Sequence, residues 1–165
     1  MKLLTLIRHA KSSWSHPHLS DHDRPLNRRG RHDAPMMGLH LKTRHLVISR
    51  MLSSTATRAV QTATLIAQPL DYPTDKIQTL TTLYAASARQ LLEVIRQQED
   101  GDHLALVGHN PGISELAAQL ANTSTHDMPT CAVLQLKFDL SHWETIATHS
   151  GHIQFYDTPK HAFNQ

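Results

Sequence analysis

Short apolar segments that alternate with helix-like segments constrain this chain more than any other feature. Residues 2–7 (KLLTLI) contain no turn-forming residue, which is typical of a strand buried on both faces of a parallel sheet. Residues 45–49 (HLVIS), 77–80 and 103–107 (HLALV) predict three further strands. Because a helical segment follows each of these strands, the order predicts βαβ units and a mainly parallel sheet.

The first two intervening segments carry helical signals of different strength. Residues 27–41 favour a helix, but two glycines and Pro35 predict that it is interrupted or starts late. Residues 56–70 show apolar positions with helical spacing, and Ser53 and Ser54 are candidate N-caps for that helix. We therefore expect one imperfect and one regular helix in this part of the chain.

Two later helices have clearer start signals. Ser87 and Gln90 form a capping box for a helix that should end near Gly101. Asn110 and Pro111 are a cap and first-turn pair for a helix that runs through residue 120. Both helices complete the alternation of strand, turn and helix.

The pattern changes after residue 129. Residues 131–138 and 143–149 form two extended segments with a turn at 139–141, which predicts a strand pair and at least one antiparallel strand. With 165 residues and 39% hydrophobic content, the chain fits one domain over residues 1–165. The expected fold class is a three-layer α/β/α sandwich with a mainly parallel sheet.

Charge and cysteine content disfavour several classes of protein. Sixteen Lys and Arg against fourteen Asp and Glu leave a net charge of +2, too small to favour a nucleic-acid partner. Cys131 is the single cysteine, so no intramolecular disulfide can form, and the N-terminus lacks a signal-peptide pattern. No apolar run approaches the roughly 18 residues of a membrane helix. We expect a cytoplasmic protein without a membrane or nucleic-acid partner.

Arginine and histidine side chains follow the predicted strands. Arg8 and His9 follow the first strand, Arg58 lies in the helix after the second, and His109 follows the fourth. Ligands of open α/β sheets bind beyond the carboxyl ends of the strands, so these side chains should converge. Arginine binds phosphate oxygens and a neutral imidazole can attack phosphorus. The set predicts metal-independent phosphoryl transfer, with one ring nitrogen of the nucleophile held by an acceptor such as a backbone carbonyl.

At these residues the sequence resembles the histidine phosphatase superfamily, which also contains the phosphoglycerate mutases. The resemblance rests on LIRHAKSSW, SSTATRAVQTA and LVGHNPG and covers nearly the whole chain. It implies a phosphoglycerate mutase-like fold and no cofactor. It also implies that His9 is the phosphorylated nucleophile, that Arg8 and Arg58 grip the phosphoryl group, and that His109 is the second pocket histidine. The segments DHDRPLNRRGRHDAPMMG, LYAASARQLL and MPTCAVLQL are most similar to SixA-type phosphohistidine phosphatases.

Two departures from the family pattern bear on the substrate. Ala10 stands where the family motif has glycine. The segment IQTLTTLYAASA has no carboxylate, whereas family branches that act on phosphomonoesters carry an acidic residue there or in an inserted region. Phosphohistidine tolerates the missing acid, because a phosphoramidate that is protonated on its imidazole releases that imidazole as a neutral leaving group. We expect the substrate to be phosphohistidine in a signalling protein such as a histidine phosphotransfer domain.

Several polar residues near these motifs have two interpretations. Asp21 and Asp23 are candidate general acids, although Asp23, beside Arg24, could equally form a structural ion pair or lead into the first helix. Ser12, Ser15 and Asn110 are candidate substrate-binding residues, with loop hydrogen bonding or helix capping as the structural alternative. The sequence does not decide between these interpretations.

The long loop at residues 11–25 is rich in histidine. Its three histidines at positions 16, 18 and 22 have no distinctive metal-ligand spacing, so we expect no metal site. Trp14 and Tyr84 could border a substrate or fill space. Two alternative functions remain open: a phosphatase of small phosphomonoesters in the same superfamily, and a noncatalytic module that binds phosphate or phosphohistidine.

Overall fold

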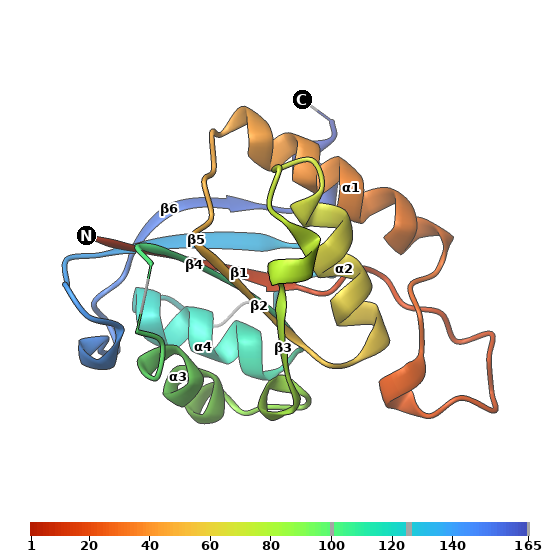
Figure 1. Cartoon of the computed structure of the whole chain (residues 1–165), viewed down its shortest axis with the longest axis horizontal. Helices are drawn as coiled ribbons and strands as arrows, with labels where there is room; N and C mark the ends of the chain where they lie inside the picture. The colour runs from red at the N-terminus through yellow and green to blue at the C-terminus, as the bar shows by residue number, and fades with distance from the viewer. Residues whose placement is uncertain (100, 125–126, 165) are drawn as a thin grey trace.

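The computed structural model describes residues 1–99, 101–124 and 127–164. It contains a six-stranded sheet with the strand order β3-β2-β4-β1-β5-β6 and helices on both faces (Figure 1). The strands are β1 (Lys2–Arg8), β2 (Arg50–Ser54), β3 (Gln78–Leu80), β4 (His103–Gly108), β5 (Val133–Phe138) and β6 (His152–Asp157). The helices are α1 (Arg28–Thr43), α2 (Thr57–Ala67), α3 (Ala88–Arg96), α4 (Gly112–Ala121) and α5 (Pro159–Ala162).

The sheet is parallel in its first four strands and antiparallel at one edge. β1, β2, β3 and β4 pair in parallel, β5 runs antiparallel to β1, and β6 runs antiparallel to β5. Helices α1 and α2 cover one face and α3 and α4 cover the other (Figure 1). Leu104 and Leu106 pack in one core cluster and Ala105 and Val107 in the other, so β4 is buried on both faces. The predicted fold class is confirmed.

Helix α1 is continuous, so the expectation of an interrupted or late helix is wrong. Asn27 caps it by accepting a hydrogen bond from the backbone N–H of Gly30 at 2.9 Å. A Cβ at Gly30 would overlap the Lys11 carbonyl, and one at Gly38 would crowd the backbone of Ile66. Because these glycines permit close approach, packing against neighbouring segments stabilises the helix despite its weak propensity.

Strand β2 lies five residues later than the sequence predicts. His45 has a φ of 58° in the turn that ends α1, and Val47 is 81% exposed, so residues 45–49 are not a strand. The buried pair Met51 and Leu52 instead pairs with β4. Ser53 and Ser54 therefore end β2 and are not helix caps, and α2 starts after Ala56 without a side-chain cap.

Three other boundaries differ from prediction. The capping box of α3 is present, but the helix ends at Arg96 rather than near residue 101. The N-cap position of α4 is Pro111, so Asn110 is not its cap. The extended segment at 143–149 is wrong: Trp143 is buried in a 3-10 turn, and the partner of β5 is β6, at residues 152–157.

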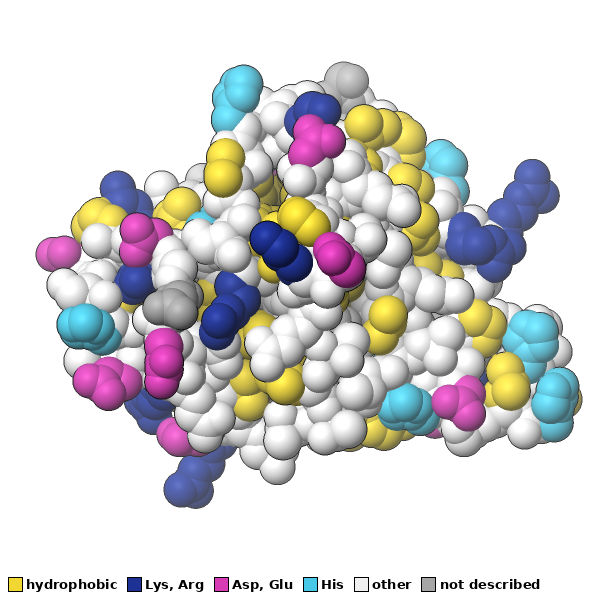
Figure 2. Space-filling view, in the orientation of Figure 1, with side chains coloured by type: hydrophobic (Ala, Val, Ile, Leu, Met, Phe, Trp, Pro, Cys, Tyr) yellow, Lys and Arg dark blue, Asp and Glu magenta, His cyan; other side chains and the backbone are white. Residues whose placement is uncertain are grey.

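Residues 11–20, which we call the arm, connect β1 to a short 3-10 turn at Asp21–Asp23. The arm and this turn project from the body of the molecule near the start of α1 (Figure 1), and histidine side chains gather there (Figure 2). No described helix has the length and apolar character needed to cross a membrane. After the arm, the turn at Asp21–Asp23 brings the chain back to the carboxyl ends of the strands, where the candidate site lies.

Candidate active site

The carboxyl ends of β1 and β4 and the start of α2 bring the predicted phosphoryl-transfer residues together. The ring centroids of His9 and His109 lie 5.1 Å apart, and both residues are buried. Arg58 Nε lies 3.4 Å from His9 Nε2. Arg8, the last residue of β1, contributes positive charge that lowers the pKa values of both histidines.

His9 is held in a single tautomer. Its Nδ1 lies 2.7 Å from the carbonyl oxygen of Ala10, which can only accept a hydrogen bond, so Nδ1 carries the proton. The lone pair is therefore on Nε2, towards which Arg58 points its N–H. Burial lowers the pKa of His9 to about 3, and the nearby His109, Arg58 and Arg8 act in the same direction. The imidazole is neutral at neutral pH, as attack on phosphorus requires.

Ala10 fits its position without strain. It is fully buried, and its backbone N–H donates to Thr62 Oγ1 at 2.9 Å. Its φ is not among the positive values of this chain. The alanine that replaces the glycine of the family motif therefore leaves the carbonyl free to hold His9.

His109 is fixed by a residue whose role the sequence did not predict. Its Nε2 lies 2.8 Å from Ser54 Oγ at the end of β2. Its Nδ1 is buried and has no hydrogen-bond partner among the described residues. Burial and the positive charge of Arg58 lower the pKa of His109 to about 4. A polar residue at a strand end was the available signal for Ser54, but the sequence placed it in a helix cap.

Arg8 and Asn110 share one acceptor. Arg8 Nη1 donates to the Met128 carbonyl at 2.9 Å, and Asn110 Nδ2 donates to the same oxygen at 3.0 Å. Asn110 Oδ1 accepts a hydrogen bond from Ser114 Oγ at 2.6 Å. The Nε atom of Arg8 is buried and unpaired among the described residues. Asn110 thus helps to anchor Arg8 through their shared acceptor. Arg8 Nε and His109 Nδ1, which have no partner among the described residues, are suited to bind an oxyanion.

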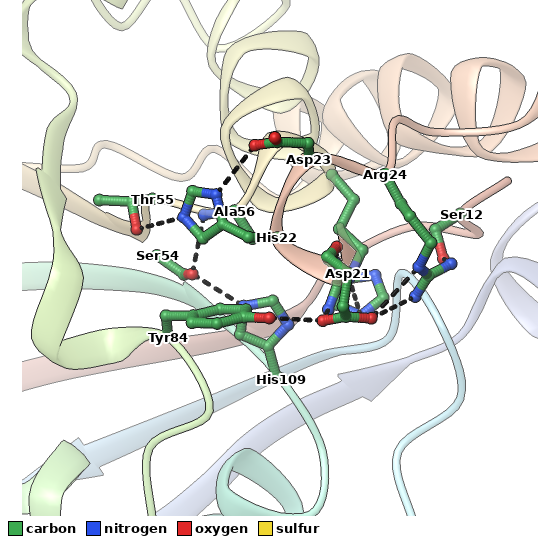
Figure 3. Close-up of polar contacts among 12 residues, drawn as sticks. Ser12, Asp21, His22, Asp23, Arg24, Ser54, Thr55, Ala56, Tyr84 and His109 are labelled. Atoms are coloured by element: carbon green, nitrogen blue, oxygen red, sulfur yellow. Dashed lines mark hydrogen bonds and ion pairs between the residues drawn. The ribbon is translucent and has the colours of Figure 1, made fainter. Parts of the chain in front are cut away.

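Asp21 lies at the centre of the polar network in Figure 3. Its carboxylate accepts hydrogen bonds from Tyr84 Oη at 2.6 Å and Arg58 Nη2 at 3.0 Å, and its other oxygen accepts from Arg24 Nε at 3.2 Å. The Tyr84 hydrogen bond, followed by those of the arginines, holds the pKa of Asp21 well below its usual range. Asp21 is therefore ionised at neutral pH and orients Arg58. An ionised carboxylate carries no proton, so Asp21 is not suited to act as a general acid.

The second candidate acid lies further out. Asp23 has a side chain that is 61% exposed, and its carboxylate contacts His22 Nδ1 at 3.2 Å. His22 Nε2 lies 2.8 Å from Thr55 Oγ1, and its ring packs edge-on against Tyr84 at 4.8 Å. Tyr84 in turn packs edge-on against His109 at 5.6 Å. His22 and Tyr84 thus form an aromatic wall beside the site, which the sequence indicated only through the position of Tyr84 after the third strand.

The two candidate serines of the arm form hydrogen bonds with Arg24 and with Ser13. Ser12 is buried and its Oγ accepts a hydrogen bond from Arg24 Nη1 at 2.8 Å. Ser15 is exposed and its Oγ lies 2.8 Å from Ser13 Oγ. The structure therefore places Ser12 beside the network of Asp21, whereas it does not bring Ser15 to the paired histidines.

Two further expectations concern metals and the cysteine. Among the described residues, no three His, Cys, Asp or Glu side chains are grouped so that they could hold a metal ion. Cys131 is buried, and its backbone N–H donates to the carbonyls of Arg8 and His9 at 3.1 Å. Burial raises the pKa of its thiol, so Cys131 is a structural residue that holds the segment before β5 against the end of β1.

Comparisons with known proteins give a consistent result. Residues 4–84 match the family model of the histidine phosphatase superfamily, branch 1. An uncharacterized protein of Mycobacterium tuberculosis is 36% identical over 136 residues, which cover 82% of each chain. The SixA protein from Agrobacterium tumefaciens has a similar structure, with a TM-score of 0.82, 24% identity, and coverage of 96% of this chain and 98% of that one. The protein histidine phosphatase SixA complexed with tungstate gives a TM-score of 0.81, 22% identity and the same coverage.

Proposed function

The chain belongs to the histidine phosphatase superfamily, and from this membership we propose that it removes the phosphoryl group from phosphohistidine in a partner protein. The observation that carries the proposal is the state of His9, a buried neutral imidazole whose Nε2 lone pair faces Arg58 Nε and whose ring lies beside that of His109. The similar fold of a protein histidine phosphatase supports the same substrate class.

In the first step, His9 Nε2 attacks the phosphorus atom of the substrate. The new bond forms between Nε2 and phosphorus, and the bond between phosphorus and the substrate imidazole breaks. The electron pair stays on the substrate nitrogen, whose ring already carries a proton on its other nitrogen. Nucleophile and leaving group are the same chemical group, so no proton has to move in this step.

During this transfer the site residues stabilise the charge on the phosphoryl oxygens. Arg58 Nε, which points at His9 Nε2, then donates to a phosphoryl oxygen. Arg8 Nε, which is buried and has no partner among the described residues, provides a further donor. His109 Nδ1 does the same when Ser54 Oγ donates to His109 Nε2 and leaves the ring proton on Nδ1. The Ala10 carbonyl stabilises the positive charge that develops on the His9 ring.

In the second step, water attacks the phosphorus atom of phospho-His9. The bond between phosphorus and Nε2 breaks, His9 returns to its neutral form with the proton on Nδ1, and both protons of the water leave on dihydrogen phosphate. The product charge equals that of the phosphoenzyme, so this step also balances without an external acid.

The state of Asp21 favours phosphohistidine over a phosphomonoester. An alkoxide leaving group needs a proton in the transition state, whereas an imidazole does not. Asp21 is the carboxylate that contacts Arg58, and it is ionised and saturated with hydrogen-bond donors. The carboxylate that contacts Arg58 is therefore not in a state to protonate an ester oxygen.

The test is a time course with two substrates in EDTA: a phosphorylated histidine phosphotransfer domain and p-nitrophenyl phosphate. Wild type, His9→Ala and the matched surface variant His152→Ala are compared. We expect loss of phosphate from the protein to be faster than ester cleavage, abolished in His9→Ala and unchanged in His152→Ala. Preference for the ester would assign the chain to small substrates, and no turnover of either substrate would favour a binding module.

A further inference from the structure

The two tryptophans of this chain have opposite environments. Trp143 is 1% exposed and fills the core, whereas Trp14, in the arm, is 75% exposed. A single exposed aliphatic side chain is common on protein surfaces, but tryptophan is the residue type most enriched at the centres of protein interfaces. The exposed position of Trp14 in the arm therefore favours a role in binding.

Trp14 is exposed but its position is fixed. The guanidinium carbon of Arg24 lies 3.5 Å from the centroid of its ring. Arg24 is itself buried and is held by Ser12 Oγ at 2.8 Å, by the Ser13 carbonyl at 3.1 Å and by Asp21. The contacting face of the indole thus rests on a fixed cation while most of the side chain remains in solvent. An anchor that is already ordered loses little conformational entropy on binding.

The same contacts connect Trp14 to the nucleophile. Asp21 binds both Arg24 and Arg58, and Arg58 Nε lies 3.4 Å from His9 Nε2. Trp14 is therefore linked to the candidate nucleophile through Arg24, Asp21 and Arg58.

The surface next to the arm is basic. Lys11 lies at the base of the arm, and its carbonyl accepts the backbone N–H of Asn27, the residue that caps α1. Lys11 and the arginines of the first turn of α1 are exposed (positions 11, 28, 29 and 31). Basic side chains extend from this end of the molecule beside the arm (Figure 2). Asp33, in the next turn of α1, is buried and its carboxylate pairs with Arg29 Nε at 3.4 Å. The charge of Arg29 is thus partly balanced, and Lys11, Arg28 and Arg31 give this surface its positive charge.

We propose that Trp14, Lys11 and the first turn of α1 form the docking surface for the phosphohistidine protein, with Trp14 as the apolar anchor and the cations facing an acidic surface around the phosphorylated histidine. This inference rests on the proposed function and names the surface through which that substrate binds. Opposite charges across an interface accelerate encounter and select the partner, while a central aromatic anchor supplies affinity.

The test compares a phosphorylated histidine phosphotransfer domain with free phosphohistidine, which has the same leaving group but no protein surface. The variants are Trp14→Ala and Lys11→Glu. Their matched controls are Val47→Ala, an exposed apolar residue in the turn before β2, and Lys76→Glu, an exposed lysine before β3. We expect kcat/KM for the protein substrate to fall about tenfold in each arm variant and kcat/KM for free phosphohistidine to stay within about twofold. The controls should change neither value.

Each other outcome is informative. An equal loss on both substrates, or no loss on the protein substrate, overturns the docking surface and leaves the proposed chemistry in place. A wild type that cleaves free phosphohistidine but not the protein does the same. A wild type that cleaves neither form of phosphohistidine overturns the proposed function together with the inference.

Discussion

The Nε atom of Arg58 lies 3.4 Å from Nε2 of His9, so a fixed cation points at the lone pair of the candidate nucleophile. Arg58 is held there by Asp21, whose backbone carbonyl and carboxylate accept from both terminal nitrogens at 2.6 and 3.0 Å. The Nε–H of the guanidinium is directed at His9 rather than at Asp21. The orientation of Arg58 therefore depends on the turn at residues 21–23, which lies outside the sheet.

Asp21→Asn should act through Arg58 rather than through proton transfer. The amide keeps the shape of the side chain but removes its charge, so Arg58 is held less firmly and kcat/KM should fall about tenfold on both free phosphohistidine and p-nitrophenyl phosphate. Tyr84→Phe, which removes one donor to Asp21, should have a smaller effect in the same direction. The measurement is the pH profile of kcat/KM between pH 5 and 8. A selective loss of ester cleavage together with a lost pH limb would instead identify Asp21 as a general acid.

The buried histidines should make the ligand-free protein sensitive to mild acid. The pKa values of His9 and His109 are lowered to about 3 and about 4, whereas an unfolded histidine titrates near 6.5. Between these values the unfolded chain binds protons that the folded protein does not, so stability falls as the pH decreases from 6.5 towards 4. The slope is about 1.4 kcal/mol per pH unit for each histidine.

Urea unfolding at pH 7.0, 6.0 and 5.0 measures this dependence. His9→Gln should reduce the slope by the contribution of one proton, and the exposed control His152→Gln should leave it unchanged. If His9→Gln and wild type gave the same slope, the imidazole of His9 would not be held neutral by burial.

An oxyanion should bind between the two histidines and change their protonation. Tungstate or phosphate would pair with Arg8 Nε and His109 Nδ1, the buried nitrogens without a described partner. Negative charge at this position raises the pKa values of both imidazoles, so binding at pH 5.5 should take up protons. Calorimetry in two buffers of different ionisation enthalpy detects this uptake. Binding should weaken at least about tenfold in Arg58→Ala, and binding of equal strength in that variant would place the anion elsewhere.

Gly30→Ala should destabilise the contact between the arm and α1. The new Cβ would overlap the carbonyl of Lys11, a backbone atom that cannot move without shifting the arm. We expect a loss of about 2 kcal/mol in the free energy of unfolding. The matched variant Gly108→Ala places its Cβ 3.4 Å from a flexible leucine methyl group and should cost less. Chemical denaturation gives the free energy of unfolding of both variants. A loss in Gly30→Ala no larger than that in Gly108→Ala would show that the arm shifts to accommodate the new Cβ.

Local sequence signals were sufficient for much of the fold. The apolar runs of β1 and β4 were predicted because a strand buried on both faces leaves a continuous apolar pattern in the sequence. The capping box of Ser87 and Gln90 was predicted because its two hydrogen bonds join residues three positions apart. The convergence of Arg8, His9 and His109 follows from strand ends that meet at one edge of a parallel sheet.

Long-range packing determined what the sequence signals could not. The position of β2 depends on pairing with β4, because residues 45–49 are as apolar as a strand but lie in the turn after α1. The continuity of α1 depends on Lys11 and Ile66, whose backbones approach its two glycines. The local signals in the sequence are compatible with either position of β2 and with either a continuous or an interrupted α1.

The sequence by itself determined the alternation of strands and helices and the residue types at the strand ends, because both are encoded within a few neighbouring positions. Only the tertiary structure decided the charge state of Asp21. Its pKa is lowered by Tyr84, Arg58 and Arg24, of which the first two are 63 and 37 positions away in the chain. Electrostatic interactions of this kind act through distance in space, so a carboxylate that the sequence presents as an acid becomes, in the folded protein, the anion that orients Arg58.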